Sequence, residues 1–279
     1  MDLRVFGLRA HSLRAATVNV VSLHRRFNGP VIVGHRGAGR GSVTSGLLTV
    51  RENTLESFLL AYQCGVQWIE TDAVRTADDQ LTLHHDTVIA NGTPIRRLTL
   101  AETEELGLTS LSKAFEHLPP DLGMIVEVKH VLSDLYDARS TADLVAEALI
   151  AERVRSGRQI ASYGFEGSTS QRLGLDRLQS AGVSLGTIAE GGSDLAGMIM
   201  TANMFGLPIV AAHTSTLLGE RAERQMRPSA LKELIASAHE KGHVVLAWCP
   251  SAEESQHLSA AGIDALCVDN VPEFMSTWV

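Results

Sequence analysis

Pairs of charged residues stand at the ends of short apolar runs in the first half of the chain. Glu70 and Asp72 close the run VQWIETD, and Glu127 and Lys129 close the run GMIVEVK. Residues two apart on a strand point to the same face, so each pair would project together. An apolar strand does not turn such charges inward unless they are paired or bind an ion. Three carboxylates at one rim favour a hard divalent cation, Mg²⁺ or Ca²⁺, which prefers oxygen ligands.

Basic residues and histidines accompany these carboxylates. Arg36 and Lys129 would place two positive charges beside the metal. This combination suits a phosphate ester better than a neutral substrate, because cations stabilise charge that develops on phosphoryl oxygens. His35 and His85 also end expected strands and could supply the two proton transfers that phosphodiester cleavage needs. The residues therefore predict an enzyme whose partner is a small-molecule phosphodiester.

Each of these features also has a structural interpretation. A strand-end histidine can simply be satisfied within the fold, and the charged pairs could be exposed edge pairs or ion pairs. Their joint occurrence at four strand ends favours a site instead. His84 points away from the face of His85 and is predicted to be structural. His213 ends a later strand and is a candidate for the wall of the site.

The elements that must position these residues alternate between β-branched runs and helical patterns. The clearest helix, TLESFLLAYQCG, repeats apolar residues at helical spacing, with Asn53 as its N-cap and Gly65 as its stop. Two further helices, 229–242 and 252–262, each end in Gly before the next strand. The expected strands are 30–35, 66–72, 80–86, 123–129, 158–162, 183–189, 207–213, 243–249 and 263–269.

This alternation predicts a parallel sheet covered by helices, in the α/β class. The strand 80–86 follows its predecessor after only the polar link AVRTADD, so it is interpreted as an excursion within one unit. Eight main strands remain, which suits a closed (β/α)₈ TIM barrel with its site at the C-terminal strand ends. An open doubly wound sheet that binds a dinucleotide requires a helix directly after its glycine-rich turn. Here GHRGAGRG is followed by a Ser/Thr/Gly-rich stretch instead.

Charge, cysteine content and hydropathy exclude several classes of protein. The 279 residues include 24 Lys+Arg and 32 Asp+Glu, a formal net charge of −8, which argues against a nucleic-acid partner. Three Cys without CxxC spacing imply neither a disulfide framework nor a thiolate zinc site, and a reducing, cytoplasmic location is expected. The chain has no apolar run of about 20 residues, so we expect no transmembrane segment and no membrane contact. Residues 1–29 are predicted to be a lead-in segment rather than a secretory signal, and 30–279 a single domain.

The motifs GHRG, ENT opening a helix, GxxxIETD, TxDxxxxxHHD and VEVK together resemble the glycerophosphodiester phosphodiesterase family, over about residues 31–272. The resemblance implies a (β/α)₈ barrel that hydrolyses glycerophosphodiesters to glycerol 3-phosphate and an alcohol with a divalent metal. It further implies roles for particular residues: catalysis by His35 and His85, metal ligation by Glu70, Asp72 and Glu127, phosphate contacts by Arg36 and Lys129, a site-organising Glu52 at the rim, and an aromatic pocket wall at Trp248.

The chain departs from the family pattern in two places. The stretch between His35 and Glu52 is longer than in most bacterial members and resembles the loop of choline-diester enzymes. After Trp248 the usual Thr-Val-Asn is replaced by Cys-Pro-Ser, on the wall expected to face the alcohol. Residues 87–121 correspond to a small family insertion that caps the pocket, and their shortness predicts an open site.

Two alternative functions stay open at this point. One is a phospholipase-D-like lyase that forms a cyclic phosphate from choline or ethanolamine lipids. The lack of a signal peptide and of Cys pairs argues against its secreted forms. The other is a non-catalytic phosphodiester-binding barrel, which would be expected to have lost a histidine or a metal carboxylate.

Overall fold

Eight parallel strands close into a barrel. The computed structural model describes residues 29–129, 140–165, 175–189, 194–219 and 227–278. β1 (Val31–Gly34) pairs with β12 (Ala265–Val268) on one side and with β4 (Trp68–Arg75) on the other, which closes the sheet. The remaining barrel strands lie between β4 and β12 in chain order: β7 (Gly123–Val128), β8 (Ile160–Tyr163), β9 (Ser184–Ala189), β10 (Ile209–His213) and β11 (Val244–Trp248). The predicted (β/α)₈ TIM barrel is confirmed.

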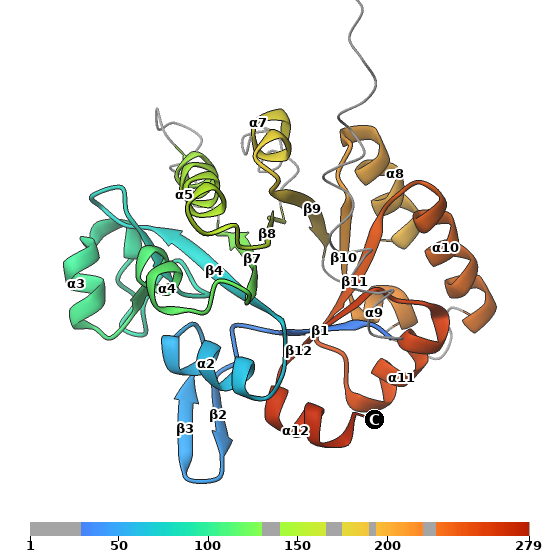
Figure 1. Cartoon of the computed structure of the whole chain (residues 1–279), viewed down its shortest axis with the longest axis horizontal. Coiled ribbons are helices and arrows are strands. Elements are labelled where there is room, and N and C mark those ends of the chain that lie inside the picture. The colour runs from blue at the N-terminus through green and yellow to red at the C-terminus, as the bar shows by residue number, and fades with distance from the viewer. Residues whose placement is uncertain (1–28, 130–139, 166–174, 190–193, 220–226, 279) are drawn as a thin grey trace, which may run out of the picture.

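Helices follow the strands and surround the barrel (Figure 1). The amphipathic segment after β1 becomes α2, and a helix also precedes each of the later strands, as the repeated strand–helix pattern predicts. The helices are α2 (Leu55–Gln63), α5 (Thr141–Ser156), α7 (Leu175–Ser180), α8 (Leu195–Phe205), α9 (Thr214–Leu218), α10 (Pro228–Glu240), α11 (Ala252–Ala261) and α12 (Val271–Thr277).

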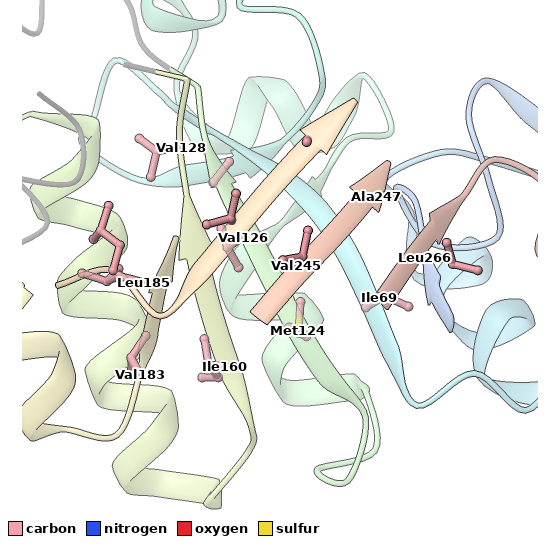
Figure 2. Packing of buried hydrophobic residues seen from close by; sticks show 14 of the residues in the cluster. Ile69, Met124, Val126, Val128, Ile160, Val183, Leu185, Val245, Ala247 and Leu266 are labelled. Carbon is pink, nitrogen blue, oxygen red and sulfur yellow. The ribbon is translucent and has the colours of Figure 1, made fainter. Parts of the chain in front are cut away.

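Alternating side chains divide the core into two layers. Ile69 of β4 and Val126 of β7 face outward and pack in the large cluster between strands and helices (Figure 2). Trp68 and Ile125, their neighbours in sequence, face inward and join a smaller cluster inside the barrel. Because side chains alternate along a strand, the acidic residues that continue the inward series come to lie inside the barrel near the C-terminal strand ends.

The strand expected at 80–86 is an excursion, as predicted. β5 (Leu81–Leu83) runs antiparallel to β4 and therefore lies outside the parallel set. β6 (Thr109–Ser110) pairs antiparallel with β5 and extends the sheet further. Between them lie η1 (Ile95–Arg97) and α3 (Leu100–Glu105), and α4 (Leu111–His117) follows β6. That the segment 87–121 caps the pocket stays a prediction.

Two local expectations need correction. The N-cap of α2 is Thr54, whose hydroxyl accepts a hydrogen bond from the Ser57 amide, and not Asn53. Asn53 has a φ of 57°, a conformation that frees its side chain for the interior. The stretch after His35 is not a plain loop, because β2 (Ser42–Ser45) and β3 (Leu48–Arg51) pair as an antiparallel hairpin. Their short β-branched runs were too brief to signal strands.

The lead-in segment predicted for 1–29 lies outside the described residues except for Gly29. Among the described residues, no helix combines the length and the apolar character needed to cross a membrane.

Candidate active site

Three carboxylates converge inside the barrel at the ends of β4 and β7. Each of Glu70, Asp72 and Glu127 offers an oxygen within 4.8 Å of the others, and each is at most 6% exposed. The parallel register pairs Asp72 directly with Glu127, which explains how residues far apart in sequence meet. The structure therefore brings together the three residues expected to ligate a metal.

Two cations hold this acidic cluster. The Lys129 ammonium lies 2.5 Å from Glu127 Oε1 and 2.9 Å from Asp72 Oδ1. The Arg36 guanidinium lies 3.5 Å from Asp72 Oδ2 and forms a two-oxygen contact with Glu52 at 3.0 and 3.1 Å. Burial alone would lower the pKa of both cations, but the neighbouring carboxylates outweigh burial and raise it. Both side chains therefore stay charged.

The cluster carries more negative charge than its protein neighbours neutralise. Burial, followed by the charges of Asp72 and Glu127, raises the pKa of Glu70 well above its ordinary value. Burial and the charge of Asp72 likewise raise the pKa of Glu127 to about 7. Glu70 Oε1 is buried without a hydrogen-bond partner among the described residues. A divalent cation that prefers oxygen ligands would fit this cluster, because it would neutralise the excess carboxylate charge and use the unpaired oxygen.

His35 follows β1 and lies between the acidic cluster and β12. Its Nε2 is 3.8 Å from Glu70 Oε2, and its Nδ1 is 2.5 Å from Asp269 Oδ1. Burial would raise the pKa of Asp269, but the hydrogen bond and charge of His35 outweigh it and lower that pKa. The Cys249 thiol approaches the same Nδ1 at 3.6 Å. The imidazole is thus oriented by a carboxylate on one side and faces the acidic cluster on the other.

His85, just after β5, lies half-buried with its Nδ1 2.8 Å from Asp86 Oδ1. Burial and the charge of Lys129 lower the pKa of His85, which places this ring in the electrostatic field of the acidic cluster and its cations. His84 instead places its Nδ1 2.7 Å from the Asp86 carbonyl oxygen. Both histidines thus lie against Asp86, one at its backbone and one at its side chain, and a structural role for His84 stays a prediction.

Unusual backbone conformations gather at this rim. Arg36, Asn53 and Cys249 have φ values of 53°, 57° and 56°, a region that L-residues with long or branched side chains rarely occupy. Gly39 has a φ of +146°, and a Cβ there would fall 1.7 Å from the Asp269 carbonyl oxygen. Only glycine lets the loop after β1 approach the end of β12 this closely. Strain of this kind is typical of functional sites.

Asn53 anchors the acidic cluster from the start of α2. Its amide nitrogen donates to Asp72 Oδ2 at 2.8 Å, and its carbonyl oxygen accepts from the Thr71 hydroxyl at 2.7 Å. The adjacent Glu52 holds Arg36 and accepts a hydrogen bond from the Gly41 amide. Glu52 therefore connects the loop after β1 to the guanidinium, and its site-organising role stays a prediction.

An aromatic group lines the side of the site formed by β8, β10 and β11. Trp248 packs edge-on against His213 at 4.4 Å and against Phe165 at 6.0 Å between ring centroids. Lys129 Nζ lies 5.9 Å from the Phe165 ring centroid, which connects this wall to the acidic cluster. His213 thus contacts the wall residue Trp248, while its own Nδ1 lies 2.7 Å from the Ser215 hydroxyl.

Sequence reasoning missed Asp269, Phe165 and the role of Asn53. Asp269 stands directly after β12, so it has the same strand-end signal as the other charged residues of the rim. Cys249, on the wall expected to face the alcohol, also places its sulfur 3.6 Å from His35 Nδ1, a contact that sequence reasoning did not predict. Phe165 follows β8 but carries no charge, so it has no such strand-end signal.

Comparisons with known proteins place this geometry in a family. The model of the "Glycerophosphoryl diester phosphodiesterase family" matches residues 35–185, more than half of the chain. The human glycerophosphocholine phosphodiesterase GPCPD1 is 22% identical and aligns with 88% of this chain, although the chain spans only 44% of that protein. A glycerophosphocholine phosphodiesterase from Schizosaccharomyces pombe is 30% identical over 41% of this chain and 9% of its own length. The chain thus spans less than half the length of these curated relatives.

Solved structures share the fold. A putative glycerophosphodiester phosphodiesterase from Galdieria sulphuraria superposes with a TM-score of 0.68 at 23% identity, over 89% of this chain and 98% of that one. An Oleispira antarctica phosphodiesterase in complex with the product sn-glycerol-3-phosphate gives 0.66 at 17% identity, over 92% and 98%. At such identities the superpositions establish the barrel alone. Together with the family match, which covers the acidic cluster and both His35 and His85, they lead to one conclusion: the chain belongs to the glycerophosphoryl diester phosphodiesterase family.

Proposed function

We propose that this protein hydrolyses a glycerophosphodiester to glycerol 3-phosphate and an alcohol, in a divalent-metal-dependent reaction. The observation that carries the proposal is the buried cluster of Glu70, Asp72 and Glu127 with two cations and His35 around it. Such a set of carboxylates has no structural advantage in a barrel interior, because burying uncompensated charge destabilises the fold. Its chemistry fits a metal and a phosphate.

The three carboxylates would hold the cation, with Mg²⁺ and Ca²⁺ both compatible with oxygen ligands. The metal would supply charge stabilisation for the phosphoryl oxygens. Arg36 and Lys129 already lie beside Asp72, so their free donors would contact the same phosphate oxygens. Asn53 and Glu52 would hold Asp72 and Arg36 in these orientations, which lowers the cost of ordering the site when substrate binds.

The two histidines would divide the proton transfers. A lowered pKa keeps the His85 imidazole neutral near pH 7, which fits the base that takes a proton from the attacking hydroxyl. His35 has the Asp269 carboxylate on Nδ1, which fixes the orientation of the ring, so we assign to His35 the role of the acid that protonates the leaving alkoxide through Nε2. The attacking hydroxyl is either water or the neighbouring hydroxyl of the glycerol, which would form a cyclic phosphate first.

The alcohol of the substrate would lie against Trp248. Its ring, with Phe165 at right angles to it, offers π-faces near the phosphate side of the site. A choline-type cation would bind such faces by cation–π attraction, worth about 0.5–2 kcal/mol. The curated relatives act, by their names, on glycerophosphocholine, and this supports choline as the first alcohol to test.

The test is a panel of glycerophosphodiesters with choline, ethanolamine, inositol, serine and glycerol as alcohols, with coupled detection of glycerol 3-phosphate. We expect release of glycerol 3-phosphate in the presence of Mg²⁺ or Ca²⁺. Accumulation of a stable cyclic phosphate from a choline or ethanolamine lipid would support the lyase instead. Binding of these diesters without turnover would support a non-catalytic barrel.

A further inference from the structure

A second group of metal-binding side chains lies on the far side of His35 from the acidic cluster. His35, Cys249 and Asp269 each offer one ligand atom within 4.8 Å of the others. They come from the ends of β1, β11 and β12, three adjacent strands of the barrel. None of the proposed steps of phosphodiester hydrolysis uses the Cys249 thiol.

We propose that His35, Cys249 and Asp269 form a site for a thiophilic divalent cation of the zinc class, and that occupation of this site inhibits the enzyme. A nitrogen, a sulfur and a carboxylate oxygen are the ligand types that Zn²⁺ takes in proteins. Mg²⁺ and Ca²⁺ do not favour a thiolate, whereas the all-oxygen set of Glu70, Asp72 and Glu127 suits them. The all-oxygen group would therefore bind Mg²⁺ or Ca²⁺, and the group with the thiol would bind zinc.

One of two ligand distances already suits zinc, and the other requires a small opening. Tetrahedral zinc with bonds of about 2.0–2.3 Å separates its ligand atoms by roughly 3.3–3.8 Å. Cys249 Sγ already lies 3.6 Å from His35 Nδ1. Asp269 Oδ1 lies 2.5 Å from the same nitrogen, so this pair must exchange its hydrogen bond for the metal and open by about 1 Å. Three protein ligands leave the fourth position to water.

The Cys249 thiol is fixed in place within reach of solvent; burial, followed by the charge of Asp269, raises its pKa, so a metal must displace the thiol proton to bind. Cys249 is held at a φ of 56°, so the backbone fixes the thiol in place at some strain. Its amide donates to the Cys267 carbonyl oxygen at 2.9 Å, which secures the turn to β12. Cys249 and Asp269 are each partly exposed, so a metal from solution can enter. Binding would release the thiol proton to solvent.

The consequence for catalysis follows from the nitrogen that the metal would occupy. Zinc on Nδ1 leaves the His35 ring neutral with its proton on Nε2. That nitrogen then cannot accept a proton, and it releases one far less readily than an imidazolium does. Inhibition is therefore expected whether His35 acts as acid or base. The inhibition rests on the proposed role of His35, whereas zinc binding itself does not.

The first experiment measures binding on the full chain with Mg²⁺ in excess, using Cd²⁺ as a spectroscopic probe. Wild-type protein should show thiolate-to-cadmium absorbance equal to one thiolate per chain. Cys249→Ser should lose this absorbance and bind Zn²⁺ at least about tenfold more weakly, since even outer partners of metal ligands are worth about 10–100-fold in affinity. Cys64→Ser, at the end of α2, is the matched control and should behave as wild type. Unchanged absorbance or unchanged zinc affinity in Cys249→Ser overturns the site.

A second measurement needs no variant. Zn²⁺ should slow alkylation of Cys249 in the wild-type protein at least about tenfold, read by mass spectrometry, and leave Cys64 alkylation unchanged; equal rates for Cys249 overturn the site. With an active glycerophosphodiester, Zn²⁺ should inhibit wild type and Cys64→Ser but not the residual activity of Cys249→Ser. Equal inhibition of all three would refute the inhibitory role. A protein that binds zinc through Cys249 but hydrolyses no diester would instead refute the proposed function.

Discussion

Replacing Glu127 by Gln tests whether Glu127 is a metal ligand or only a structural partner of Lys129. Glu127 is buried, and its pKa of about 7 stands above the ordinary 4.5. At a pH between those two values, Glu127 of the metal-free folded protein therefore holds a proton that the same residue has lost in the unfolded chain. Stability then falls as pH rises through this window, because the folded state binds more protons than the unfolded state does.

The size of the effect follows from the same two pKa values. A tenfold change in an ionisation equilibrium corresponds to about 1.4 kcal/mol, so ionised Glu127 costs the metal-free fold about 3 kcal/mol at pH 8. Gln has nearly the same shape and never ionises. The stability of Glu127→Gln relative to wild type should therefore increase by about 3 kcal/mol between pH 4 and pH 8. For a chain of this size that is roughly 6–12 °C in relative Tm.

Thermal unfolding in EDTA at pH 4, 6 and 8 measures this difference. Glu105→Gln is the matched control, because it removes the same charge from an exposed position at the end of α3 and should show no such trend. Added Ca²⁺ or Mg²⁺ should then stabilise wild type and Glu105→Gln, but Glu127→Gln much less.

The opposite result is equally clear. If Glu127 serves only to pair with Lys129, its removal leaves a buried ammonium with one partner fewer, and the variant is destabilised most at high pH, where wild-type Glu127 is ionised. Equal metal stabilisation of variant and wild type, together with that destabilisation, refutes the metal-ligand reasoning.

Four further outcomes test the site. Exhaustive EDTA treatment should abolish activity and added Mg²⁺ or Ca²⁺ restore it, whereas full activity after chelation contradicts the metal requirement. His85→Ala should lower kcat by about 10²–10⁴-fold, and a wild-type rate removes His85 from the mechanism. Asp269→Asn should lower kcat about tenfold or more and shift the alkaline limb of the pH–rate profile, since the carboxylate charge beside His35, the proposed acid, is lost; an unchanged profile makes Asp269 structural. Trp248→Ala should raise KM for choline diesters more than for small neutral ones, and an equal rise for both means that Trp248 only shapes the pocket.

The barrel and most of its charged rim were predictable because both depend on local patterns. Each strand is a short β-branched run, and each charged pair follows such a run directly. Once a barrel is assumed, the C-terminal strand ends must converge, so Glu70 and Glu127 meet without any knowledge of side-chain contacts. The antiparallel excursion at β5 was also predictable, because the polar link between β4 and β5 is too short for a crossover to a parallel strand.

The remainder depends on barrel closure and on backbone conformation. Asp269 contacts His35 only because β12 pairs with β1, across 234 positions of sequence. Asn53 has the residue type of an N-cap, and only its positive φ directs the amide toward Asp72. The position of Cys249 depends on a similar conformation after β11. Sequence periodicity carries no information on such single-residue turns, so the contacts of Asn53 and Cys249 could not be predicted.

The unfavourable terms of this fold are concentrated at one end of the barrel, and this concentration has a physical cause. The strand–helix layer and the lower barrel interior are mainly apolar and close-packed, and the charges buried below the rim are paired, as Arg158 is with Glu152 at 2.9 Å. At the upper rim, Glu70 and Glu127 have raised pKa values, and Arg36 and Cys249 have left-handed backbone conformations. A cation bound by the carboxylates would offset the ionisation cost while leaving the loop geometry unchanged. Metal binding should therefore act mainly on the electrostatics of the rim, while the packed strands keep the ligands in place before the ion arrives.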